Sequence, residues 1–134
     1  MIYLLDTNVV SVLRRPDRSP QLLRWMADKP EDALYISVIS LGEIKRGIAR
    51  QKKVNPAFAA DLIGWLGGLE EQFADRFIPF GADDARIWGN LIDRIGYFTA
   101  DLLIAATALA HDATVVSGDK SFVATGVRLE NPFL

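Results

Sequence analysis

The sequence predicts an α/β domain in which helices cover both faces of a mostly parallel sheet of four or five strands. Short apolar or β-branched runs alternate along the chain with longer segments that carry apolar residues at helical spacing. Such alternation is typical of βαβ units and a parallel sheet. Half of the 134 residues are hydrophobic and 24% are charged, which is the composition of a globular chain. We therefore expect a three-layer α/β/α sandwich.

The expected elements follow one another without a linker, a repeat or a low-complexity segment, so residues 1–134 are predicted to form a single domain. Strands are expected at residues 2–5, 34–38, 77–80 and 114–117, with a possible fifth, edge strand at 127–130. Helices are expected from residue 7 to about 15, and over 20–29, 38–50, 55–73, 83–95 and 101–110. In the first of these helices, Thr7 or Asn8 is the expected N-cap.

The helix expected after Thr99 is almost wholly apolar, because Thr107 is the only polar residue between Leu102 and Ala110. Such a helix should be buried on nearly every side. Asp101 stands at its start, and an unpaired buried carboxylate costs several kcal/mol, roughly, unless a cation or hydrogen-bond donors satisfy it. Asp101 therefore marks a candidate functional site.

Two further acids follow expected strands: Asp6 ends the first strand and Asp119 comes just after the fourth. The carboxyl ends of parallel strands meet at one edge of a sheet, where α/β folds gather ligands. Because Asp101 starts the helix that precedes the fourth strand, we expect all three acids near this edge. Glu43, in the helix after the second strand, would reach the same rim.

Glu43 has two interpretations. With Ser40 it forms the Ser-x-x-Glu spacing of a capping box, which would make it a helix cap. If Ser37 is the cap instead, Glu43 lies well inside the helix and faces the first strand. The sequence leaves both open.

Four acids in one cleft would repel one another, and a divalent cation relieves that repulsion. The chain has no cysteine and one histidine, so oxygen ligands dominate and favour Mg²⁺ or Mn²⁺ over zinc. His111 closes the apolar helix and Asp83 and Asp84 open the preceding one. We interpret these three residues as structural, because each sits at the helix end that favours its charge.

Composition also limits the classes of function. A net charge of −2, from 15 basic and 17 acidic residues, argues against binding long nucleic acid by bulk electrostatics. It does not exclude a nucleic-acid enzyme with an acidic metal site. The longest apolar run is too short for a bilayer, which takes about 20 residues, and no signal peptide is visible. We expect a cytoplasmic protein that does not bind membranes.

Two surfaces have a structural interpretation and an alternative. Lys45, Arg46 and Arg50 form a basic face that is expected to be solvated, with phosphate contact as the alternative. An apolar stripe in the 55–73 helix is expected to pack in the core, with a dimer or helix-in-groove contact as the alternative. The stripe consists of Phe58, Leu62, Trp65, Leu69 and Phe73.

Four segments together resemble the signature segments of PIN-domain nucleases, and more narrowly the VapC class of toxin ribonucleases from type II toxin–antitoxin operons. They are Leu4-Leu-Asp-Thr-Asn8, Ser37-Val-Ile-Ser-Leu-Gly-Glu43, Asp101-Leu-Leu-Ile-Ala-Ala-Thr-Ala108 and Val115-Val-Ser-Gly-Asp-Lys-Ser-Phe122. The resemblance runs from end to end of the chain, and the order of the segments makes it more specific than any single motif.

The resemblance implies a PIN-like fold and assigns roles to individual residues. Asp6, Glu43, Asp101 and Asp119 would form the acidic metal site. Thr7 and Asn8 would orient Asp6 or contact the metal's ligands, and Ser117 would fill the small hydroxyl position before the fourth acid. The implied reaction is Mg²⁺- or Mn²⁺-dependent hydrolysis of RNA phosphodiester bonds by a metal-activated water. The implied partners are an RNA substrate, a second copy in a homodimer and a cognate antitoxin.

Two positions depart from the family pattern. Many relatives carry Asp where this chain has Ser121, and Pro where it has Thr99. Two other functions stay open. A phosphatase of the haloacid dehalogenase type also has Asp after its first strand, but it has a second Asp where this chain has Asn8. A non-catalytic binding module would use the acids only to bind a metal or a basic partner.

Overall fold

The computed structural model describes all residues 1–134, and five parallel strands form one sheet in the order β3-β2-β1-β4-β5. The strands are β1 (Tyr3–Leu5), β2 (Leu34–Ser37), β3 (Phe77–Ile78), β4 (Thr114–Val116) and β5 (Arg128–Glu130). The α/β prediction is confirmed, including the fifth strand at an edge. Strand β3 is shorter than expected and ends before Pro79, which cannot donate to the sheet.

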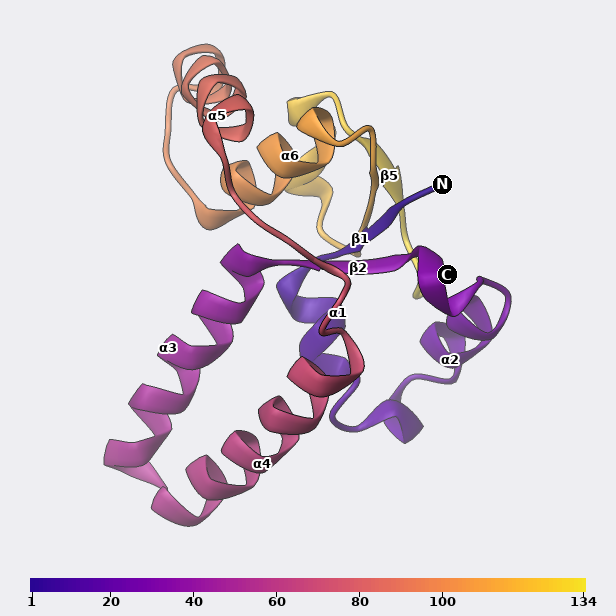
Figure 1. The fold of residues 1–134 in the computed structure, drawn as a ribbon, viewed down its shortest axis with the longest axis vertical. Coiled ribbons are helices and arrows are strands. Elements are labelled where there is room, and N and C mark those ends of the chain that lie inside the picture. Colours follow the sequence, from indigo (N-terminus) through magenta and orange to yellow (C-terminus); the bar gives the residue numbers. More distant parts are fainter.

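Six α-helices connect and cover the strands (Figure 1). They are α1 (Thr7–Val12), α2 (Pro20–Ala27), α3 (Val38–Val54), α4 (Pro56–Gln72), α5 (Ala82–Ile95) and α6 (Ala100–Ala110). Three short 3₁₀ helices are η1 (Pro16–Arg18), η2 (Glu31–Ala33) and η3 (Lys120–Thr125). In Figure 1, helices α1–α4 lie on one side of the sheet, and α5 and α6 on the other. The arrangement is the expected three-layer sandwich.

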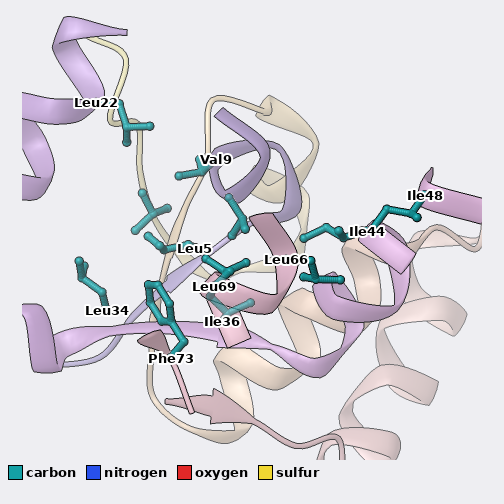
Figure 2. Close-up of a cluster of buried hydrophobic side chains, with 12 residues drawn as sticks. Leu5, Val9, Leu22, Leu34, Ile36, Ile44, Ile48, Leu66, Leu69 and Phe73 are labelled. Carbon is teal, nitrogen blue, oxygen red and sulfur yellow. The ribbon is translucent and has the colours of Figure 1, made fainter. Parts of the chain in front are cut away.

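Two separate cores fill the spaces between these layers, because successive residues of a strand point to opposite faces of the sheet. Leu5 and Val116 belong to the core under α1–α4, whereas Leu4 and Val115 belong to the core under α5 and α6. Figure 2 shows the first core, where side chains from strands β1 and β2 meet those of helices α1–α4. Most of the apolar stripe of α4 packs into this core, as expected.

Helix α6 belongs to the second core, and six of its residues are buried. The expectation of burial on nearly every side holds except at Leu109, which is 39% exposed. Asp84 accepts a hydrogen bond from the Gly81 N–H at 3.1 Å at the start of α5, and its other oxygen lies 3.5 Å from His111 Nε2. Both residues therefore have the structural role that the sequence suggested.

Two predictions about α1 are wrong. The helix ends at Val12 rather than near Arg15, because Pro16 opens the following turn and η1. Its N-cap is Asp6 rather than Thr7 or Asn8, since the Asp6 side chain accepts the Val9 N–H. No helix of the chain has the length and apolar character needed to cross a membrane.

The strand order places a topological switch point at the carboxyl ends of β1 and β4. From β1 the chain adds β2 and β3 on one side, and it then returns to add β4 and β5 on the other. Connections after neighbouring strands diverge to opposite faces at such a switch point, and ligands of α/β proteins bind there. Asp6 follows β1 and Ser117 follows β4, so the predicted acids lie around this position.

Candidate metal-dependent active site

Asp6 is the most deeply buried of the candidate acids, with 3% of its surface exposed. Its Oδ1 accepts the Val9 N–H at 2.8 Å, and its Oδ2 accepts a hydrogen bond from the Ser117 hydroxyl. Both carboxylate oxygens are thus held, one by the start of α1 and the other by the end of β4. Burial and hydrogen bonds fix the orientation of this side chain.

The pKa of Asp6 is raised above its usual value, chiefly by burial. The negative charge of Asp119 raises this pKa further, while hydrogen bonds from Ser117, Val9 and Asn8 act in the opposite direction. Desolvation disfavours the charged carboxylate, whereas donors favour it. The site therefore holds a carboxylate that a cation would stabilise.

Ser117 joins two of the acids. It is 1% exposed; its Oγ donates to Asp6 and accepts the Asp119 N–H at 2.9 Å. The exposed Asp119 caps η3 by accepting the Ser121 N–H at 2.8 Å. The small hydroxyl that the family resemblance implies for this site directly links the segments after β1 and β4.

Asp101 lies in the first turn of α6 and is half-buried. Its pKa is raised, first by burial and then by the negative charges of Asp119, Asp6 and Glu43, while a hydrogen bond from Ser121 lowers it. The Ser121 hydroxyl donates to Asp101 Oδ2 at 3.2 Å. The predicted acids thus lie near enough for three of them to act on the fourth.

Glu43 lies one turn inside α3, and Ser37 caps that helix by accepting the Ile39 N–H at 3.0 Å. The capping-box interpretation with Ser40 is therefore wrong. The Thr7 hydroxyl lies 2.5 Å from Glu43 Oε1 and 2.8 Å from Ser40 Oγ. Thr7 thus contacts Glu43 rather than Asp6, and it ties α1 to α3 at the edge of the sheet.

The donor chemistry at this site fits Mg²⁺ or Mn²⁺, because carboxylates and hydroxyls are hard oxygen ligands. No group of three or more Asp, Glu or His side chains is arranged in this structure so that it could hold an ion. The observation in favour of a cation is electrostatic, since the negative charges of neighbouring acids contribute to the raised pKa values of Asp6 and Asp101.

Two features of the site were not found from the sequence. Ser121 was noted only as a departure from a family pattern, yet its hydroxyl is the hydrogen-bond partner of Asp101. Arg14, Arg15 and Arg18 line a cleft together with Asn8, although the sequence indicated only a turn there. The clustered arginines around Pro16 were the available signal for this cleft.

Comparisons with known proteins agree with the fold. Residues 3–127 match the PIN domain family. The chain is 33% identical to VapC ribonuclease Y4jK of Sinorhizobium fredii, over 96% of each chain. It is 32% identical to toxin FitB of Neisseria gonorrhoeae, over 97% of each chain. The crystal structure of FitAcB from N. gonorrhoeae superposes with a TM-score of 0.84 at 32% identity, over 98% of each chain. The chain therefore belongs to the PIN-domain family, within which it resembles the VapC toxins.

Proposed function

We propose that this chain is a divalent-metal-dependent endoribonuclease and the toxin of a type II toxin–antitoxin module. The observation that carries the proposal is the electrostatic coupling of Asp101 with Asp119, Asp6 and Glu43 at the switch point of the sheet. The names of the VapC ribonuclease and FitB relatives support RNA as the substrate and toxicity as the biological effect. The proposal includes activity in the cytoplasm, where a toxin that cleaves cellular RNA would meet its substrate.

Asp6, Glu43, Asp101 and Asp119 would hold the metal. When bound, Mg²⁺ or Mn²⁺ would lower the pKa of a water molecule and neutralise charge on the scissile phosphodiester. Ser117 orients Asp6, Thr7 orients Glu43 and Ser121 orients Asp101, each through a hydrogen bond to a carboxylate oxygen. Such partners of ligand side chains typically matter about 10- to 100-fold in metal affinity or activity.

The phosphatase alternative is not favoured by the environment of Asp6. Both of its oxygens accept hydrogen bonds, and 3% exposure leaves little room for attack on a phosphoryl group. Asn8, which stands where that family has its second Asp, is exposed. The antitoxin and the homodimer belong to the proposal through the resemblance to VapC proteins.

The experiment measures cleavage of total RNA by the purified protein with Mg²⁺, with Mn²⁺ and with EDTA, followed by mapping of the new RNA ends. We expect metal-dependent cleavage that falls at least about 100-fold in Asp6→Asn and Asp101→Asn. Asp83→Asn is the control, because Asp83 is an exposed acid on α5 that pairs with Arg86. Expression of the active forms, but not of the two site variants, should stop growth, and a co-expressed antitoxin should restore it.

Three results would contradict the proposal. Full cleavage by Asp101→Asn would show that the acidic site is not catalytic. Binding of Mn²⁺ without cleavage of any RNA would indicate the non-catalytic binding module. A trapped aspartyl-phosphate on Asp6 would instead support the phosphatase.

A further inference from the structure

A basic cleft of about 380 Å³ adjoins the acidic site along helix α1. Its lining consists of Asn8, Ser11, Val12, Arg14, Arg15 and Arg18, so it contains three cations and no acid. Asn8 is separated from Asp6 by Thr7 alone. A chain with net charge −2 thus gathers three arginines in a cleft along α1, the helix that Asp6 caps.

The three guanidinium groups are free of acidic partners. None of them takes part in an ion pair or a side-chain hydrogen bond, whereas Arg76 and Arg128 are held by acids and by backbone carbonyls. Arg14 lies 4.9 Å over the ring of Phe58, a contact that leaves its N–H donors unused. Arg15 and Arg18 are exposed. Fifteen N–H donors, five for each arginine, are therefore available to a ligand.

The cleft shares two lining residues with a groove that contains Glu43. Ser11 and Arg14 also line a second groove, which contains Thr7 and Glu43. A strand lying in the basic cleft can therefore pass Ser11 and Arg14 into the groove that Glu43 lines. The backbone that carries the arginines is fixed by the Pro16 turn and by the Arg18 N–H, which donates to the Arg15 carbonyl at 3.0 Å.

We propose that Arg14, Arg15 and Arg18 bind successive phosphates of a single-stranded RNA on one side of the scissile bond. This inference rests on the proposed ribonuclease function and adds the path of the substrate. Acids that gather at a cleavage site repel the phosphate backbone, so binding requires compensating cations nearby. The planar guanidinium suits phosphate, because its parallel N–H groups can donate to two phosphate oxygens together.

The cations of α3 provide the comparison. Lys52 and Lys53 are exposed in the last turn of that helix and line none of the clefts. Figure 1 shows α3 running away from the sheet, so this turn lies far from the strand ends that carry the acids. Replacing both lysines removes the same charge as replacing Arg15 and Arg18.

The test measures binding of a fluorescent 12-nucleotide single-stranded RNA of mixed sequence in EDTA, between 50 and 200 mM salt. The logarithm of the association constant falls as the logarithm of the salt concentration rises, and each lost phosphate contact makes this slope shallower by about 0.7. The double variant Arg15→Gln/Arg18→Gln should therefore lose about 1.4 in slope, and about 10- to 100-fold in affinity at 50 mM salt. Lys52→Gln/Lys53→Gln should bind as the wild type does.

A charge-conserving variant separates binding from folding. Arg15→Lys/Arg18→Lys should keep the salt slope, and the thermal midpoint of every variant should match that of the wild type. The proposal is overturned if the wild type does not bind the RNA. It is also overturned if Arg15→Gln/Arg18→Gln and Lys52→Gln/Lys53→Gln lose affinity equally, or if Arg15→Gln/Arg18→Gln has the salt slope of the wild type. EDTA removes catalysis from this measurement. If the wild type cleaves RNA with metal but the arginine variant keeps the wild-type salt slope, only the proposed arginine site is overturned. If the slope changes as expected but no RNA is cleaved, only the proposed ribonuclease function is overturned.

Discussion

Ser117 and Asp6 lie 111 positions apart in the sequence, and the hydroxyl of the first donates to the carboxylate of the second. The register of the parallel strands explains this contact. Leu5 of β1 pairs with Val116 of β4, so the next residue of each strand emerges at the same point on the sheet edge. The Asp6 N–H also donates to the Val116 carbonyl at 3.1 Å. The sheet itself therefore places the first acid of the site.

Ser117→Ala removes the donor that favours the charged form of Asp6, so the pKa of Asp6 should rise further. If ionised Asp6 is needed for cleavage, the acid limb of the pH–rate profile should move to higher pH. We expect about a 10-fold loss of RNA cleavage near neutral pH that narrows as the pH increases.

Ser19→Ala is the control for Ser117→Ala. Ser19 is also buried, but its hydroxyl caps α2 by accepting the Leu22 N–H at 3.3 Å. Its loss should reduce the free energy of unfolding by about 1 kcal/mol and leave the pH profile in place. Superimposable profiles for Ser117→Ala and the wild type would show that the hydroxyl does not tune Asp6.

Asp101→Asn should stabilise the protein at neutral pH although it removes catalysis. Burial raises the pKa of Asp101 in the folded state above its ordinary value of 3.8. Between these two pKa values the folded protein binds more protons than the unfolded chain, so stability falls as the pH rises through this range. Removing the charge removes that loss of stability.

The free energy of unfolding of Asp101→Asn should exceed that of the wild type at pH 7 without metal. The advantage should shrink as the pH falls and vanish below 3.8, where the wild-type carboxyl becomes protonated in both states. Chemical denaturation across this pH range measures the difference. Asp61→Asn, at an exposed acid of α4, is the control and should show no such trend. Equal stability of Asp101→Asn and wild type at every pH would contradict the account of its environment.

Periodicity and strand-end logic predicted the layers, the parallel sheet and the region in which Asp6, Asp101 and Asp119 meet. These features depend on local patterns and on the rule that parallel strands share one carboxyl edge. The hydrogen bond between Thr7 and Glu43 could not be predicted, because it depends on the packing of α1 against α3, which no local sequence pattern describes. Ser40 and Ser37 both fit as caps for α3, and only the structure selects Ser37. The exposure of Leu109 could not be predicted, because an apolar residue on a helix surface has no signature in the sequence.

Thr7→Val tests whether the link between α1 and α3 positions Glu43. Valine keeps the shape of threonine but removes the hydroxyl that contacts Glu43 and Ser40. We expect a loss of about 10- to 100-fold in metal-dependent cleavage. The free energy of unfolding should fall by about 1 kcal/mol, the usual contribution of one hydrogen bond.

Thr107→Val is the matched comparison for Thr7→Val. Thr107 is buried, whereas Thr7 is half-buried, and the Thr107 hydroxyl donates to the Leu103 carbonyl within α6 at 3.0 Å and touches none of the acids. Cleavage by this variant should stay within about 2-fold of wild type, because replacing a hydroxyl that only returns to its own helix changes little. Unchanged activity of Thr7→Val would mean that Glu43 needs no support from α1.

Ser121→Asp restores the residue that many relatives have beside the third acid. It replaces a donor to Asp101 with a negative charge, so without metal it should raise the pKa of Asp101 and lower stability at pH 7. With Mg²⁺ or Mn²⁺ the added carboxylate becomes a further hard ligand, and the stabilisation by metal should increase. A ligand present at 100 times its Kd stabilises the folded state by about 2.7 kcal/mol, so tighter binding appears as a larger shift of the thermal midpoint. Thermal unfolding against metal concentration measures both effects.

Ser121→Ala is the control, since it loses the hydrogen bond to Asp101 without adding a ligand, while the backbone N–H of residue 121 remains for Asp119. Equal metal-induced shifts in the aspartate and alanine variants would place position 121 outside the metal site.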